Sequence, residues 1–555
     1  MIGFPTSSTS TSWSRRHAWP LYSEGGMIGA AHPLTAEAGL AILRSGGNAV
    51  DAAVGAGLVA AVVMPEMCGL GGDLFAVLHV PGADGADGQI VSVQGSGISP
   101  RNASIDLMRA NGTAEGQMPY QGPLSISVPG MVDAYEQLLT RYGTMTFAQV
   151  AERAIELARH GFPLQPLGAA AIASCADLLR QDQAASAVFL ANGEAPQPGD
   201  ILKQPDLADT IAHIGQQGGR DFYEGGLAKR LVDYLNAVGS PFTLDDFAAH
   251  TTDIGTPYAT TYRNYAVYQT AIPSQGLILL ESLNIVEHAD LSDPFSAESI
   301  HTMVEAKKLA YADRLRHAAD PNFHTTPLET ILSKPWAADR FATIDPDHAA
   351  TRVGGGALTD GDTTYLNVID EDGMMVSLIQ SVSSAFGSGV VGGDTGVLFN
   401  NRVGRGFTLQ EGHVNQYAPG KKTMHTLNCY LVADASGRPV LVGGTPGGDG
   451  QPQWNLQALV NMIDAGLDAQ AAIEAPRWTS WPGTDPSIID NPFELWIEDR
   501  IDPAVIATLR EKGHQVRELA GWDGGGAMQI IARDPETGLL IGGTDGRVEG
   551  NVLGF

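Results

Sequence analysis

The sequence predicts an α+β fold in which helical layers lie against antiparallel sheets. Helical spacing dominates the chain before residue 363, whereas paired strands joined by short turns dominate after it. Strand, helix and strand do not alternate along the chain, which disfavours a doubly wound parallel sheet. With 43% hydrophobic residues among 555, the chain has ample material for a large buried core.

Helices are expected first, and two strands follow them. Apolar residues recur at helical spacing over 34–43 and 49–63, and Gly46-Gly47-Asn48 separates the two helices. A glycine-rich turn over 65–73, which ends at Asp73, leads into predicted strands at 74–80 and 89–94. The region 131–344 is read as mostly helical, with helices at 131–142, 146–160 and 297–319.

Paired strands are expected in the last third of the chain. A polar, glycine-rich connector at 345–362 precedes them. Two hairpins are predicted, with strands 364–369 and 374–382 around the turn 370–373, and strands 428–433 and 440–443 around the turn 434–437. Helices return at 455–465 and 468–475.

Charge and composition exclude several classes of partner. The chain has 33 basic and 62 acidic residues, and its formal charge of −29 repels nucleic acid and anionic membrane surfaces. No stretch approaches about eighteen uninterrupted apolar residues, so no membrane span is expected. The three cysteines, Cys68, Cys175 and Cys429, have no CxxC spacing, so neither a disulfide framework nor a zinc knuckle is indicated. We expect no metal and no other cofactor.

Residues 1–26 are read as a loose leader. They are rich in Ser and Thr, and the adjacent Arg15 and Arg16 lack the apolar run that an export signal requires. A cytoplasmic location is therefore expected, and a periplasmic one is left open.

The dipeptide Asp362-Thr363 is a candidate cleavage site with a candidate catalytic residue. Cleavage of this peptide bond would expose an N-terminal threonine at the start of a strand. A free α-amine with a pKa near ~8 can accept the proton of the threonine hydroxyl, so one residue would supply both nucleophile and base. An ordinary turn is the alternative interpretation of this short string.

Several motifs, in their order and approximate spacing, resemble the γ-glutamyltranspeptidase family. The resemblance runs from about Met27 to Phe555 and is carried by seven segments: 46–53, 69–72, 127–130, 362–364, 386–391, 396–401 and 444–448. It implies a four-layer αββα N-terminal nucleophile hydrolase that cuts itself between Asp362 and Thr363. The products would be a large piece, 27–362 after the leader, and a small piece, 363–555, which form one interleaved domain. Pairing of two such heterodimers is left open.

The resemblance also implies roles for individual residues. Thr363 would attack an amide carbonyl and form an acyl-enzyme, and the backbone N–H groups of Gly447 and Gly448 would stabilise the oxyanion, a task in which one donor is worth ~3 kcal/mol. Ser381 matches a hydroxyl residue that contacts the nucleophile, and Thr364 would assist by hydrogen bonding. Positions matching the family's substrate pocket are Ser383, Asn400 and Asn401.

The pocket departs from the family pattern at four places. Ser96 stands where γ-glutamyl enzymes have an arginine that grips the substrate α-carboxylate. Arg101 is nearby in sequence, but its displacement by five residues should point it elsewhere. Arg405 stands where an acidic residue usually meets the α-amino group. His425 and Thr426 replace a pair of serines, and the segment 407–422 is shorter than the usual lid loop.

These departures predict a small, anionic amide substrate, such as an oxamate-like compound or a dicarboxylic monoamide. Its acyl group would be received by Arg402, Arg405 and His425. Two alternatives remain: a genuine γ-glutamyl hydrolase or transpeptidase with a rebuilt carboxylate clamp, and an uncut, noncatalytic homologue that binds a ligand. The sequence leaves the acyl group, the acceptor and the assembly state open.

Overall fold

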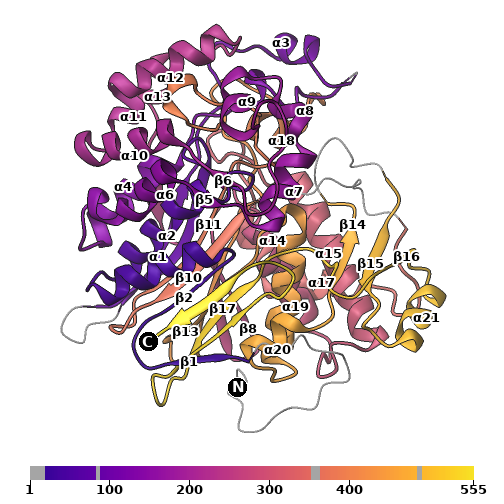
Figure 1. Cartoon of the computed structure of the whole chain (residues 1–555). Helices are drawn as coiled ribbons and strands as arrows, with labels where there is room; N and C mark the ends of the chain where they lie inside the picture. The colour runs from indigo at the N-terminus through magenta and orange to yellow at the C-terminus, as the bar shows by residue number, and fades with distance from the viewer. Residues whose placement is uncertain (1–18, 83–87, 115, 352–362, 484–490) are drawn as a thin grey trace.

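Two seven-stranded sheets lie face to face, and helices cover both outer surfaces (Figure 1). The computed structural model describes residues 19–82, 88–114, 116–351, 363–483 and 491–555. Every strand pairing within the two large sheets is antiparallel. The predicted αββα arrangement is therefore confirmed.

Each sheet combines strands from distant parts of the chain. Sheet A has, in spatial order, β1 (Leu21–Ser23), β18 (Leu540–Thr544), β17 (Gln529–Arg533), β13 (Pro439–Gly444), β12 (Tyr430–Ala433), β9 (Tyr265–Gln269) and β8 (Tyr258–Tyr262). Sheet B has β19 (Asn551–Gly554), β2 (Met27–Ala30), β10 (Thr364–Ile369), β11 (Met375–Ser381), β3 (Asp73–Val80), β4 (Gln89–Gly95) and β7 (Asp253–Gly255). Both sheets thus mix strands that precede and follow Thr363.

Three hydrophobic clusters fill the three interfaces between the four layers. Leu366 and Val368 of β10 pack toward the helices that cover sheet B, which include α1 (Pro33–Arg44), α2 (Ala49–Val63), α4 (Met131–Tyr142) and α6 (Glu152–His160). Tyr365 and Ile369 of the same strand face sheet A, as the alternation of side chains along a strand requires. A third cluster joins sheet A to α14 (Gly276–Val286), α15 (Ala297–His317), α19 (Gln451–Ile463) and α20 (Ala469–Glu474).

The remaining elements lie around this sandwich. The other described α-helices are α3 (Ile105–Ala110), α5 (Phe147–Val150), α7 (Pro166–Ser174), α8 (Ala176–Leu179), α9 (Gln183–Phe189), α10 (Pro205–Gln217), α11 (Asp221–Glu224), α12 (Gly226–Ala237), α13 (Leu244–Ala248), α16 (Leu328–Ile331), α17 (Lys334–Phe341), α18 (Arg402–Gly406) and α21 (Pro503–Glu511). Two small sheets contain β5 (Phe162–Pro163), β6 (Ile201–Leu202), β14 (Trp478–Trp481), β15 (Glu494–Glu498) and β16 (Val516–Leu519). Within the described residues, no helix combines the length and the apolar character that a bilayer span requires.

Four sequence-based expectations need correction. Part of the supposed leader, Leu21–Ser23, is β1 and pairs with β18. The supposedly helical central region contains β7 and the hairpin β8–β9, whose Tyr- and Thr-rich strands flank a turn in which Arg263 has a φ of +54°. The chain also contains one βαβ unit, because β15 and β16 are parallel and α21 connects them. The predicted helix 146–160 is divided into α5 and α6.

Candidate functional site

Thr363 lies buried at one edge of sheet B, directly before β10. The register puts the start of β10 beside the end of β11, where Ser381 lies opposite Asp73 at the start of β3. The side chains of Tyr365, Ile379 and Phe75, each two residues away along these strands, pack between the sheets. Thr363, Ser381 and Asp73 therefore share the face of sheet B that meets sheet A.

The hydroxyl of Thr363 has the partner that the sequence predicted. Thr363 Oγ1 donates to Ser381 Oγ at 3.2 Å, and Ser381 Oγ also accepts from Ser383 N at 2.7 Å. The side chain of Thr364 lies on the opposite face, where its hydroxyl contacts Met64 Sδ at 3.6 Å. We therefore leave Thr364 out of the catalytic group. Asp362, the other side of the predicted cut, lies outside the described residues.

Ser383 adopts a strained conformation beside the nucleophile. Its φ is +92°, a value that residues other than glycine rarely adopt. Its carbonyl accepts from Arg405 Nη1 at 3.0 Å, whereas its buried Oγ has no hydrogen-bond partner among the described residues. Backbone strain of this kind tends to occur where a binding site fixes the chain.

Asp73 connects the sheet edge to three residues that the sequence placed in the pocket. His425 Nδ1 accepts from Leu427 N at 3.3 Å, so its Nε2–H donates to Asp73 Oδ2 at 2.9 Å. Arg402 Nε lies 3.6 Å from the same oxygen, and Arg402 Nη1 donates to Thr426 Oγ1 at 3.3 Å. Asp73 Oδ1 and Arg402 Nη2 have no partner in the part of the chain that the structure describes.

Burial and the arginines set the charges of this cluster. Burial raises the pKa of Asp73 to about 7, against the opposing effect of Arg402. Burial lowers the pKa of His425 well below its ordinary value, and Arg402 and Arg405 lower it further. Burial also lowers the pKa of Arg402, to about 9. At neutral pH, His425 is uncharged while Arg402 keeps its charge, so the surroundings favour an anion.

The two asparagines hold the loops rather than present open polar groups. Asn400 Oδ1 accepts from Ser127 N, Ser127 Oγ and Arg402 N, each at 3.0 Å. Asn401 Oδ1 accepts from Ser384 N at 3.0 Å, and its Nδ2 donates to Tyr120 O at 3.0 Å. Their amides thus position Arg402 and the segment that carries Ser383.

The glycine pair predicted for the oxyanion hole follows β13. Gly447 has a φ of +122°, and a Cβ there would lie 2.1 Å from the ring of Trp454. Gln275 Nε2 donates to both Gly448 O at 2.8 Å and Thr426 O at 2.7 Å, which ties this turn to the Asp73 cluster. The Gln451 amide fits better when its nitrogen faces Thr426 O, and its oxygen then accepts from Gly448 N at 3.2 Å. The Gly448 N–H would then be shared between Gln451 and an oxyanion.

Arg101 does not replace the missing carboxylate clamp, as its displacement by five residues predicted. Arg101 Nη1 donates to Asp246 Oδ1 at 3.2 Å, and its side chain is half exposed. Ser96 is buried and follows the last residue of β4, Gly95, which pairs with Leu74 beside Asp73. Ser96 therefore belongs to this sheet edge, but it brings no charge to it.

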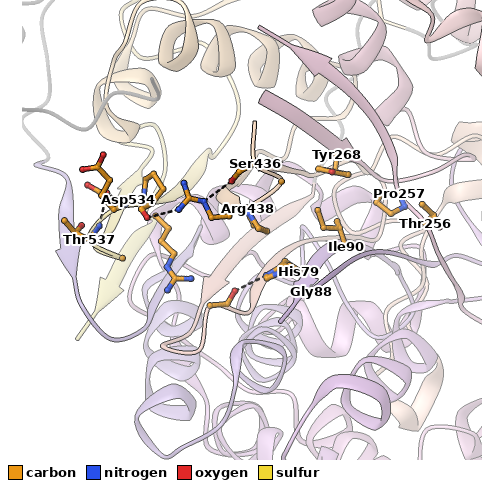
Figure 2. Close-up of a pocket in the computed structure, with 17 residues that line it drawn as sticks. His79, Gly88, Ile90, Thr256, Pro257, Tyr268, Ser436, Arg438, Asp534 and Thr537 are labelled. Atoms are coloured by element: carbon orange, nitrogen blue, oxygen red, sulfur yellow. Dashed lines mark hydrogen bonds between the residues drawn. The ribbon is translucent and has the colours of Figure 1, made fainter. Parts of the chain in front are cut away.

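A separate cleft opens at the opposite end of the sheets (Figure 2). It has a volume of about 910 Å³ and is lined by turns between strands, with His79, Tyr268, Arg438 and Asp534 among its residues. Arg438 Nε donates to Asp434 Oδ2 at 3.0 Å, and His79 Nδ1 lies 3.1 Å from Gly373 O. None of the residues predicted for catalysis lines it.

Comparison with known proteins gives one consistent result. Residues 35–555 match the Gamma-glutamyltranspeptidase family. The chain belongs to this family. It is 37% identical to the glutathione hydrolase-like YwrD proenzyme of Bacillus subtilis (strain 168), over 95% of this chain and 98% of that protein. It is 36% identical to the oxamate amidohydrolase proenzyme of Klebsiella pneumoniae, over 96% of this chain and 99% of that protein.

The fold comparison agrees with the family assignment. The crystal structure of a cephalosporin acylase from Bacillus halodurans matches with a TM-score of 0.90 and 32% identity, covering 99% of both chains. This member of the gamma-glutamyltranspeptidase family is therefore an enzyme of the N-terminal nucleophile hydrolase type. Both curated relatives are named as proenzymes, which indicates that the family makes its two subunits from one precursor.

The sequence interpretation missed two residues that organise the site. Asp73 was read only as the end of a glycine-rich turn, although an acidic residue that opens a buried strand is unusual and could have been noticed. Gln275, whose amide joins Gly448 to Thr426, gave no sequence signal.

Proposed function

We propose that the chain cuts itself between Asp362 and Thr363 and then hydrolyses small anionic amides through Thr363. Thr363 Oγ1 attacks the amide carbonyl while the new α-amine takes its proton, and the Gly447 and Gly448 N–H groups stabilise the oxyanion. The amine returns the proton to the leaving nitrogen, and the C–N bond breaks. Water then attacks the acyl ester and gives a proton to the amine, which passes it to Thr363 Oγ1 as the ester C–O bond breaks and the acid is released. Ser381, at 3.2 Å, orients the hydroxyl.

The proposed substrate class rests on buried polar atoms near Thr363 that have no hydrogen-bond partner among the described residues. Ser383 Oγ, Asp73 Oδ1 and Arg402 Nη2 make no hydrogen bond within the described residues. Each such atom costs about 1–3 kcal/mol, which a polar ligand can offset. Arg402 is charged at neutral pH and lies beside a carboxyl group whose pKa is raised, and Arg402 and Arg405 both lower the pKa of His425, so an acyl group with a negative charge fits best. The oxamate amidohydrolase among the relatives supports this choice.

A glutathione-type substrate is the second candidate. The unpartnered Asp73 Oδ1 could accept from the α-ammonium of a glutamyl group, and one relative is named glutathione hydrolase-like. Against it, Ser96 supplies no guanidinium and Arg101 is engaged by Asp246. The carboxylate would then have to bind Arg402 or Arg405.

Two matched anilides separate the candidates. Glutaryl p-nitroanilide and γ-glutamyl p-nitroanilide differ only in the α-amino group. The ratio of their kcat/KM values therefore reports whether the pocket favours or disfavours an α-ammonium group. We expect faster release of nitroaniline from the glutaryl compound, ammonia release from oxamate, and no stimulation by a dipeptide acceptor. Preference for the γ-glutamyl compound with acceptor stimulation would establish the second candidate instead.

The catalytic role of Thr363 is tested by Thr363→Ala. This variant should give one full-length band on a denaturing gel and no turnover, because both nucleophile and amine are lost. Thr364→Val is the matched control, since its side chain faces the helices, and it should give two bands and near-normal activity. Intact-mass measurement of the wild-type pieces should place the cut before Thr363. A single wild-type band without turnover would instead indicate a noncatalytic binding protein.

A further inference from the structure

Two histidines and a glutamate are buried together away from the nucleophile. His301 and Glu305 are one turn apart on α15, and His514 follows α21. One ligand atom from each residue lies within 4.8 Å of the others, and all three residues are buried. His301 Nδ1 lies 2.8 Å from His514 Nε2. The proposed mechanism uses none of them.

The hydrogen bonds around the histidines resemble those that support a bound metal. His301 Nε2–H donates to Asp345 O at 2.8 Å, which leaves Nδ1 as the nitrogen with a lone pair. Histidines that bind metals commonly donate their second ring N–H to a backbone carbonyl in this way. A cavity of about 40 Å³ beside His514 and Lys308 has room for a water as a further ligand.

We propose that His301, Glu305 and His514 bind a divalent transition metal, with Zn²⁺ as the best fit to two imidazoles, a carboxylate and a water. Two nitrogens on tetrahedral zinc are about 3.3 Å apart, so the histidine pair must open by about 0.5 Å. His514 then carries its proton on Nδ1 instead of Nε2. The site has a structural role and departs from the expectation, drawn from the sequence, that the chain binds no metal.

Lys308 limits the affinity of this site. Its Nζ lies 2.6 Å from Glu305 Oε1 and also donates to Ala350 O at 2.9 Å. Glu305 Oε2 accepts from Ala350 N at 3.2 Å, and each carboxylate oxygen keeps a second lone pair for a metal. Because the ammonium repels a second cation, its removal should tighten metal binding.

The site spans the two pieces of the proposed processed enzyme. His301 and Glu305 precede Thr363, whereas His514 follows it. The segment Asp345–Ala350, which leads toward the cut, contacts both sides, since Ala349 N donates to Lys512 O at 2.7 Å. The metal site itself does not depend on the proposed cut, but its role as a link between the pieces does.

Co²⁺ titration of the full-length protein tests the site directly. We expect tetrahedral d–d absorption with one Co²⁺ per chain, displaced by one equivalent of Zn²⁺, in both the wild type and Thr363→Ala. The absorption should be lost in His301→Gln and His514→Gln and weakened at least about tenfold in Glu305→Gln. Lys308→Met should tighten binding about tenfold. His348→Gln, at an exposed histidine within the segment Asp345–Ala350, is the control and should change nothing.

Circular dichroism and amidase activity show whether the histidine variants still fold. Loss of Co²⁺ binding in folded variants supports the site. Absence of tetrahedral absorption in the wild type, or binding that persists in both His301→Gln and His514→Gln, would overturn it. If Thr363→Ala binds Co²⁺ while the wild type stays uncut, the metal site stands and the processing proposal fails. If the wild type is cut but binds no Co²⁺, the processing proposal stands and the metal site fails.

Discussion

Two buried arginine clusters in this enzyme differ in how completely their charges are paired. The carboxyl-terminal cluster contains Arg477, Arg500, Glu498, Asp545 and Arg547. There, Arg547 binds both oxygens of Glu498, at 2.8 and 2.9 Å, and Arg477 Nη2 lies 2.9 Å from Asp545 Oδ2. In the Asp73 cluster, formed by Asp73, Arg402, His425 and Thr426, the Arg402 guanidinium nitrogen is 3.6 Å from the carboxylate.

The pKa values of the two central carboxyl groups shift in opposite directions. Burial alone would raise the pKa of Asp545, but Arg477 and Arg547 lower it below its ordinary value. Burial prevails at Asp73 and raises its pKa to about 7. Burial is similar at the two sites, so the arrangement of the arginines makes the difference. The first cluster is built for stability, whereas the second retains hydrogen-bonding capacity for a ligand.

The largest expected effect is on stability, at Arg547. Arg547→Met removes the bidentate partner of Glu498 and leaves the buried carboxylates of Glu498 and Asp545 with less compensating positive charge. This should lower the unfolding free energy by about 3–5 kcal/mol. Urea unfolding measures this, and kcat/KM per folded molecule should stay unchanged. Arg438→Met, at an exposed ion pair with Asp434, is the control and should cost no more than about 1 kcal/mol. Equal effects of the two substitutions would mean that the carboxyl-terminal cluster adds no more stability than an exposed ion pair.

The next largest effect is on activity, at Arg402. Arg402→Met should lower kcat/KM for glutaryl p-nitroanilide about a hundredfold, mainly through KM, because a charge-assisted hydrogen bond to the acyl carboxylate is worth up to about 3 kcal/mol. Stability should change little, since Asp73 can take up a proton instead of remaining a stranded charge. Arg180→Met, at the surface, is the control. If Arg402→Met unfolds at a lower urea concentration than the wild type yet keeps its kcat/KM, Arg402 stabilises the fold and does not bind the substrate.

Local patterns predicted many of the strands and helices, whereas the αββα stacking and the role of Thr363 were expected from the family resemblance. The turn at 370–373 sets the register of the hairpin β10–β11, and this register places Thr363 beside Ser381. Helix α2 has the predicted bounds because Asn48 caps it and Gly46-Gly47 interrupts the preceding helix. The assignment of Thr364 overlooked the strand alternation that turns neighbouring side chains to opposite faces.

The chemistry around the nucleophile could not be predicted in the same way. The bond between His425 and Asp73 joins residues 352 positions apart, and no local pattern reports such a contact. The hairpin β8–β9 was missed because its strands are short and lie at the edge of sheet A, where half-exposed side chains blur the alternation. The assignment of Arg402 and Arg405 to the pocket followed from the family resemblance, but the contact between Arg402 and Asp73 did not.

The smallest effect, on pH dependence, tests whether Asp73 titrates. Because its pKa is raised to about 7, Asp73 ionises as the pH rises through neutrality and adds a negative charge beside Arg402. KM for an anionic amide should therefore rise several-fold between about pH 6 and 8, and Asp73→Asn should flatten this rise while kcat keeps its pH profile.

The same titration affects stability. A carboxyl group whose pKa is higher in the folded protein stabilises it fully at acidic pH, below the unfolded value, and this stabilisation is lost as pH rises through about 7. The wild type should thus lose unfolding free energy relative to Asp73→Asn across that range. Asp245→Asn, at an exposed carboxyl group, should leave both profiles unchanged. If Asp73→Asn retains the rise in KM, the titrating group lies elsewhere, and the Asp73 cluster would be paired as firmly as the carboxyl-terminal one.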